Sequence, residues 1–214
     1  LSLTFFAACY VGVLAMTAMG ASLQLLPVAT RQPVQVQRAP VLIWWVYTPG
    51  VAAIALGMGT GHVRLLVAGA GAVALALAAY GVLLALNLRG AKGMPAVVAH
   101  GWIALVSLGL LLVTALSLAL SYVGVPLLAR STAVTLHITF AAYGFMGMLV
   151  LGLSYVLVPM FALSPPYDER RAIASCALAA LALLLAATAA FGLIPRALLA
   201  AALWLWFHRP RAAR

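Results

Sequence analysis

The stretch that decides the fold is Leu136–Phe161, which reads LHITFAAYGFMGMLVLGLSYVLVPMF. The run is apolar throughout and longer than the ~20 residues that a helix needs to cross the hydrocarbon core of a bilayer. His137 stands near its start, and Pro159 closes an S-Y-x-x-V-P exit. A histidine inside an apolar span is costly unless it has a partner, so His137 is the first candidate functional residue.

Small residues share the helix face of His137. Side chains three, four, seven or eleven residues apart stack on one side of an α-helix, so Ala141, Gly144 and Met148 return to that face. Small side chains beside a histidine leave a flat shelf for a porphyrin plane, and imidazole is a standard axial ligand of haem iron. The stretch therefore predicts a haem site formed by these four residues, with His137 as the ligand of the metal.

The composition of the whole chain is also strongly apolar. Of the 214 residues, 67% are apolar and 7% are charged, and a soluble domain of this length could not bury so much apolar surface. No ~10-residue segments of alternating polarity indicate a β-barrel. We therefore expect a single all-α integral membrane domain over 1–214, with the lipid bilayer as its first partner.

The charged residues, the cysteines and the start of the chain add three expectations. The net charge of +10 does not indicate a nucleic-acid partner, because the basic residues are spread over short loops. Cys9 and Cys176 stand alone in apolar segments, so neither a disulfide framework nor a metal cluster is expected. Leu1 lies inside an apolar run with no basic region before it, which indicates a missing or processed start rather than a signal peptide.

The apolar runs and the loops between them predict about seven transmembrane helices. Their expected bounds are 3–28, 40–59, 63–88, 95–122, 136–161, 171–192 and 195–208. The second helix opens with Trp44, Trp45 and Tyr47, aromatic residues suited to the headgroup level of a membrane. Pro49 should kink the same helix.

Basic residues favour one end of the predicted bundle. The loops after helices one, three and five and the C-terminal tail share a side, which holds Arg31, Arg38, Arg89, Lys92, Arg170, Arg171, Arg209, Arg211 and Arg214. The opposite side holds only Arg64, Arg130 and Arg196. Because short cytoplasmic loops carry an excess of Lys and Arg, we expect a cytoplasmic C-terminus in a bacterial-type inner membrane.

This orientation separates the four histidines. His62 and His137 are expected near the outer face, and His100 and His208 near the inner face. His100 and His137 begin antiparallel helices, so roughly 25 Å of membrane lies between them and they cannot ligate one iron. If both bind metal, each needs another partner: His62 for His137, a residue outside this sequence, or another subunit.

Each histidine also has a purely structural interpretation. His137 would then bond a carbonyl group or a lipid headgroup. His100, close to Trp102, also fits an anchor at the membrane surface. His62 lies in a glycine-rich turn that favours exposure to solvent. Other polar side chains in apolar spans are typical of bonds between neighbouring helices: Gln24, Asn87, Tyr143 and Tyr155.

The first and fifth predicted helices have similar sequences. VGVLAMTAMGASLQLLPV and GFMGMLVLGLSYVLVPM align with three helices between them. The matched pairs are Gly20 and Gly152, Ser22 and Ser154, and Pro27 and Pro159. The pattern indicates a four-helix unit used about twice, over 1–128 and an incomplete 129–214. Phe5 stands where the second copy has His137, so the ligand position is not repeated.

A membrane helix that begins with histidine and ends in G-x-x-x-x-L-V-P resembles one helix of subunit I of the haem–copper oxidases. In that family the histidine ligates the low-spin haem near the outer face. His137 precedes Pro159 by a similar distance. The resemblance covers helices one to six loosely, and it implies four-helix units and a b-type haem.

The chain also departs from that family. It has no His-His, His-x-His or His-Pro-Glu sequence and no acid inside an apolar span. This chain alone is therefore not expected to bind copper, reduce oxygen or pump protons. It is more similar to reduced relatives, the nitric-oxide-response haem and copper membrane proteins.

The resemblance implies a haem-binding membrane subunit in electron transfer or in the handling of NO or O2. Other membrane subunits or further copies of the chain would complete its ligand set. The alternative is a non-catalytic structural or assembly subunit of a larger membrane complex. A transporter is less favoured, because no charged residue lies in the middle of a predicted span.

Overall fold

The structure is a computed structural model that describes residues 2–33 and 36–193. Its elements are α1 (Ser2–Thr30), α2 (Ala39–Thr60), α3 (Val63–Arg89), α4 (Pro95–Ser121), α5 (Arg130–Ile138), η1 (Thr139–Gly147), α6 (Met148–Ala162) and α7 (Glu169–Ala190). The elements α5, η1 and α6 follow one another without a break and form one long helical run. The predicted helix over 195–208 lies outside the described residues.

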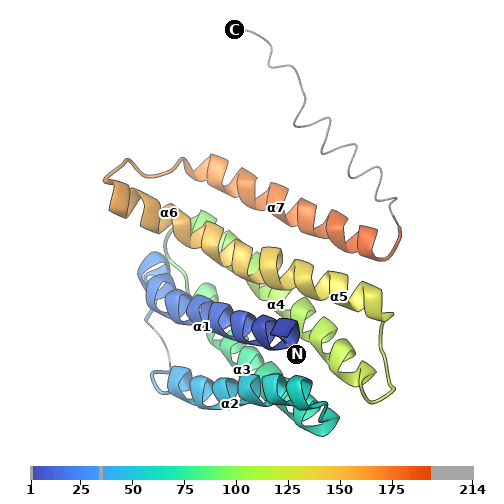
Figure 1. Cartoon of the computed structure of the whole chain (residues 1–214). Coiled ribbons are helices and arrows are strands. Elements are labelled where there is room, and N and C mark those ends of the chain that lie inside the picture. The colour runs from blue at the N-terminus through green and yellow to red at the C-terminus, as the bar shows by residue number, and fades with distance from the viewer. Residues whose placement is uncertain (1, 34–35, 194–214) are drawn as a thin grey trace.

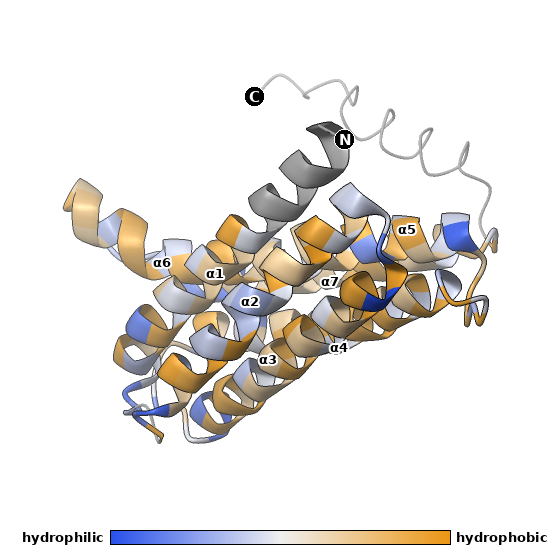
Figure 2. Ribbon diagram, turned by 60° about the horizontal axis from the view of Figure 1, so that its bottom comes forward, coloured by the Kyte–Doolittle hydropathy of each residue, from blue (hydrophilic) through white to orange (hydrophobic). Residues whose placement is uncertain are grey.

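Six helical runs among the described residues are long and apolar enough to cross a membrane. In a bilayer every backbone polar group needs an internal partner, and a helix supplies these partners from its own backbone. Hydrophobic residues cover the sides of the helices, and hydrophilic residues gather toward their ends (Figure 2). The described residues therefore form an all-helical, multi-pass membrane fold, as the sequence predicts.

Helix α4 lies at the centre of the bundle. It packs against α3 on one side and against α5, η1, α6 and α7 on the other. Helices α2 and α7 occupy opposite outer positions, and α1 lies beside α2 and α6 (Figure 1). The loops after α1, α3 and α6 lie at the same end of the bundle, as the predicted topology requires (Figure 1).

Glycines bring α2 and α3 together over the turns nearest the loop that joins them. A Cβ atom on Gly57 would lie 2.5 Å from the backbone nitrogen of Leu66, and one on Gly69 would lie 2.7 Å from the carbonyl oxygen of Gly50. Small residues let membrane helices approach closely enough for van der Waals contact between backbones, which replaces the hydrophobic drive of a soluble core. The α2–α3 hairpin is therefore fixed by the absence of side chains at its contact points.

The aromatic start of α2 divides into two environments. Trp44 and Trp45 are 45% and 64% exposed and lie edge to face, with ring centroids 4.9 Å apart. They fit the predicted headgroup position. Tyr47 does not, because it is 2% exposed and its hydroxyl donates to the Gly12 carbonyl at 3.4 Å. The surface role expected for Tyr47 is wrong. Tyr47 follows Trp45 by two residues, so its side chain lies on a different face of α2, which is turned toward α1.

The two helices with similar sequences, α1 and α6, end in the same way. Arg31 and Leu163 adopt left-handed backbone conformations, with φ of 54° and 49°. The next residue in each case donates its N–H to a proline carbonyl, Gln32 to Pro27 at 3.1 Å and Ser164 to Pro159 at 3.2 Å. Both ends are Schellman-type caps placed equally far from the aligned prolines. The four-helix repeat itself stays a prediction.

The long helical run contains a π-helical segment, Thr139–Gly147, that the sequence does not predict. A π-helix bonds each residue to the fifth along the chain instead of the fourth. Each of its residues therefore turns less about the axis than the ~100° of an α-helix. The α-helical spacing assumed for His137, Ala141, Gly144 and Met148 is wrong within this segment.

We expect Gly57→Ala to lower the free energy of unfolding by about 2 kcal/mol, because the new methyl group would overlap the backbone of α3. The measurement is thermal unfolding in mild detergent, followed by circular dichroism. Gly71→Ala is the matched control, since nothing lies within 4 Å of its added Cβ and alanine favours a helix. Equal melting temperatures for the two variants would contradict the close α2–α3 contact.

Candidate functional site

His100 lies at the contact between α4 and α6. Its side chain is 0% exposed. Its Nδ1 lies 2.7 Å from the Ala96 carbonyl oxygen, one helical turn earlier. A carbonyl oxygen can only accept, so Nδ1 carries the hydrogen and Nε2 of the neutral ring keeps its lone pair. Nε2 is buried and has no hydrogen-bond partner within the described chain. The surface-anchor interpretation of His100 is wrong, because α6 covers the residue.

A glycine on α6 makes room for this histidine. A Cβ atom on Gly152 would lie 2.8 Å from the His100 Cβ atom. The Tyr155 ring meets the imidazole edge to face, with centroids 5.4 Å apart. Gly152 follows His137 by about fifteen residues along one helical run, which corresponds to roughly 20 Å. The two intramembrane histidines therefore lie near opposite ends of the bundle, as the sequence predicts.

Tyr155 also joins α6 to α7. Its hydroxyl lies 2.6 Å from the Ser175 hydroxyl on α7. The Tyr167 ring, in the loop before α7, packs edge to face on Tyr155 with centroids 5.1 Å apart. These contacts confirm the expected interhelical role of Tyr155, and they fix its ring beside His100.

The two acidic residues of the chain are both used at helix N-termini. Asp168 caps α7, since its Oδ1 accepts from the backbone nitrogens of Arg170 at 2.9 Å and Arg171 at 3.4 Å. Glu169 accepts from the Ala96 nitrogen in the first turn of α4. A carboxylate there meets unpaired N–H groups and the positive end of the helix dipole. Glu169 thus ties the start of α7 to the helix of His100, a contact between distant segments that no local sequence signal marks.

His137 and His62 occupy different environments. His137 is half-buried, and its Nδ1 is buried with no hydrogen-bond partner among the described residues. His62 is exposed in the turn before α3, as expected, and its Nδ1 lies 3.1 Å from the Thr60 hydroxyl. No hydrogen bond joins His62 to His137 in the described chain, so their shared ligation stays a prediction. His208 lies outside the described residues.

The shelf predicted beside His137 is divided by the π-helical segment. Gly144 is buried against α4, where its added Cβ would lie 2.6 Å from the Ser107 Oγ. Met148 is 1% exposed, whereas Ala141 is half-buried. Helix α4 therefore covers Gly144, and the cofactor contacts expected of Ala141, Gly144 and Met148 stay predictions.

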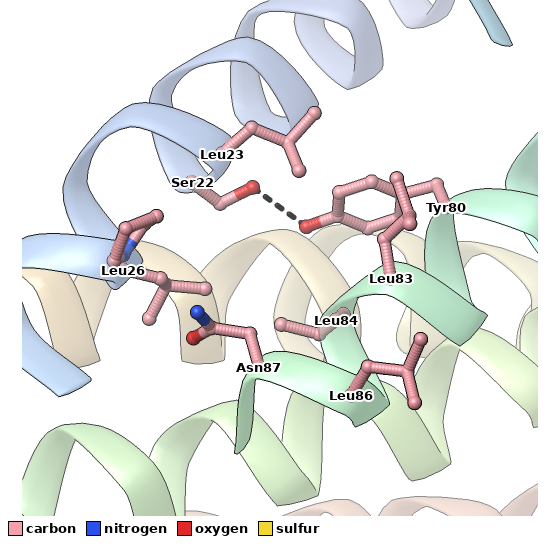
Figure 3. Close-up of a pocket in the computed structure, with 9 residues that line it drawn as sticks. Ser22, Leu23, Leu26, Tyr80, Leu83, Leu84, Leu86 and Asn87 are labelled. Carbon is pink, nitrogen blue, oxygen red and sulfur yellow. Dashed lines mark hydrogen bonds between the residues drawn. The ribbon is translucent and has the colours of Figure 1, made fainter. Parts of the chain in front are cut away.

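A second polar contact lies between α1 and α3 (Figure 3). The Ser22 and Tyr80 hydroxyls are 2.6 Å apart, and Asn87 accepts from the Thr30 hydroxyl at 3.0 Å. This confirms the interhelical role expected for Asn87, while Gln24 and Tyr143 are exposed. The adjoining cavity of about 20 Å³ holds one water molecule at most. It is far too small for a cofactor.

No protein-family model, curated protein or solved structure matches the chain. The resemblance to the haem–copper oxidases therefore stays a prediction from the sequence. Among the described residues, no group of three or more His, Cys, Asp or Glu side chains could hold a metal ion. A metal bound there through one histidine needs other ligands, and a porphyrin supplies four of them.

We expect Glu169→Ala to lower the free energy of unfolding by about 1 kcal/mol, because the N-terminus of α4 loses a charged acceptor. Thermal unfolding in detergent measures the change. Arg170→Ala is the control on the neighbouring residue, whose exposed side chain makes no hydrogen bond in the described structure. A Glu169 variant as stable as this control would show that the α7–α4 contact contributes nothing.

Proposed function

We propose that the chain is a haem-binding subunit of the membrane, with b-type haem, that acts in electron transfer or in the handling of NO or O2. One observation carries the proposal. Among the described residues, three buried side-chain nitrogen or oxygen atoms have no hydrogen-bond partner: Thr48 Oγ1, His100 Nε2 and His137 Nδ1. Leaving such an atom unpaired costs about 1–3 kcal/mol. Two of the three belong to the intramembrane histidines, which is what a ligand role requires.

His100 has the hydrogen-bond pattern of a metal-ligating histidine. Such a residue donates one ring N–H to a carbonyl or carboxylate group, which fixes the tautomer and leaves the other nitrogen for the metal. The Ala96 carbonyl is such an acceptor, and Nε2 is the nitrogen left over. His100 therefore fits axial ligation in its chemistry.

The two histidines differ in the space around them. Tyr155 and Gly152 close over His100, so a planar ligand there needs the Tyr155 ring to move away. His137 is half-buried, and a ligand can reach it with less rearrangement. The haem supplies the redox and gas-binding chemistry, while the protein ligates it, orients it and keeps water away. A second ligand would come from another subunit or another copy of the chain.

We further propose a bacterial-type plasma membrane and a cytoplasmic C-terminus. The support is the uneven distribution of cations over the two ends of the described bundle. One end carries Arg31, Arg38, Arg89, Lys92, Arg170 and Arg171, and the other carries Arg64 and Arg130. Cytoplasmic loops show this excess of basic residues.

The alternative function, a non-catalytic assembly subunit, is supported by a groove between the long helical run and α7. The groove has a volume of about 460 Å³. Its lining is apolar apart from Thr139 and Tyr143, and it includes Gly147, Ala179 and Ala182. Small residues within an apolar groove let another membrane helix approach closely.

We expect His137→Ala to lose most of the bound haem, because the half-buried imidazole loses its role as ligand. The measurement is the reduced-minus-oxidised spectrum and pyridine extract of protein purified in mild detergent with haem available. His208→Ala should keep the wild-type haem content. If His100→Ala loses its bound haem and His137→Ala retains it, the haem ligand is His100 on α4 and not His137.

The wild-type spectrum separates the two functions. About one b-type haem per chain supports the haem-binding subunit. No haem in folded wild-type protein would refute it and leave the assembly subunit as the better interpretation. In that case both histidines would be structural.

A further inference from the structure

Two loops interlock at the cation-rich end of the bundle. The backbone nitrogen of Lys92 donates to the Thr30 carbonyl at 2.9 Å, and the side-chain amide of Asn87 donates to the Gln32 carbonyl at 3.2 Å. Glycines permit this approach, since a Cβ on Gly90 would lie 3.0 Å from the Gln32 Oε1. The end of α1 and the loop from α3 to α4 are therefore held as one unit.

This unit gathers three cations, Arg31, Arg89 and Lys92, which we call the basic site. All three are exposed. The Arg31 side chain lies over the backbone of the other loop, because a Cβ on Gly93 would lie 3.5 Å from the Arg31 Nε. Lys92 directly precedes Gly93, so the Arg31 side chain lies against the segment of the other loop that carries Lys92.

The basic site has no carboxylate to neutralise it. The chain has two acidic residues. Asp168 caps α7 and lies 3.8 Å from Arg171, while Glu169 binds the start of α4. Within the described chain no salt bridge reaches Arg31, Arg89 or Lys92. Like charges carried on two interlocked loops repel one another, and an external anion relieves that repulsion.

The backbone at the site is also strained. Arg31 has φ of 54°, a left-handed conformation that is unfavourable for a residue with a side chain. Glycine would adopt it without this cost. An arginine at this position places its side chain against Gly93, the residue that follows Lys92.

We infer that the basic site binds the phosphate group of an anionic phospholipid. The site closes the ends of α1 and α3, two helices that are apolar enough to span the membrane, so it lies at the depth of the headgroups. Basic clusters at the ends of transmembrane helices recognise anionic headgroups, and arginine binds phosphate through two parallel N–H groups. Each interfacial cation adds to the attraction of such lipids. The inference does not depend on haem binding.

The test compares the affinity of detergent-purified protein for phosphatidylglycerol and for phosphatidylcholine, measured by native mass spectrometry. We expect Arg31→Gln/Lys92→Gln to weaken phosphatidylglycerol binding about tenfold or more, because two cations are removed from the headgroup. The charge-matched control is Arg64→Gln/Arg170→Gln, which removes two exposed cations elsewhere and should change the affinity less than twofold. Thermal unfolding verifies that each variant is folded, and Arg89→Gln replaces the double variant if that variant does not fold.

Two results would overturn the inference. Equal losses in the basic-site and control variants would mean that net charge alone attracts the lipid. Displacement of the lipid by millimolar inorganic phosphate would assign the site to free phosphate. Preference for phosphatidylglycerol that survives phosphate and depends on Arg31 and Lys92 would establish the phospholipid site.

Discussion

Close approach of helix backbones at glycine is the contact on which this bundle depends. Gly57 and Gly69 let the backbones of α2 and α3 come into contact. Gly144 leaves room for Ser107 of α4, and Gly152 leaves room for His100. In a membrane, lipid tails are as apolar as leucine, so association depends on shape and on dispersion between closely placed atoms. The glycines on η1 and α6 fix α4 in the centre, and α4 in turn places the buried histidine.

Polar bonds between helices complete this packing. Ser22 meets Tyr80, Thr30 meets Asn87, and Tyr155 meets Ser175, each across a helix boundary. Such bonds satisfy side chains that would otherwise be costly in an apolar surrounding. These polar side chains have hydrogen-bond partners, whereas the buried nitrogens His100 Nε2 and His137 Nδ1 have none in the described chain. That contrast gives the haem proposal its physical basis.

The helix positions could be predicted from the sequence because a transmembrane span is a one-dimensional property. Length and apolar content suffice, and the predicted bounds of the first six helices agree with those found, apart from the earlier start at Arg130 of the run around His137. The candidate site was only partly predictable. The separation of His100 from His137 follows from antiparallel spans, but the π-helical register and the contact between Glu169 and Ala96 do not. An α-helix bonds each residue to the fourth along the chain and a π-helix to the fifth. In a run of apolar side chains, the sequence pattern does not distinguish the two.

The sequence by itself determined that this is a multi-pass, all-helical membrane protein, that its cations gather at one end, and that two histidines lie inside apolar spans. These features depend on composition and order along the chain. A bilayer requires every helix to be long enough to span it and to satisfy its own backbone hydrogen bonds. Only the tertiary structure decided which face each helix buries. It placed His100 under Gly152 and Tyr155, turned Gly144 onto Ser107, and brought Arg31 beside Lys92. Those placements depend on contacts between residues far apart in sequence, which no local pattern encodes.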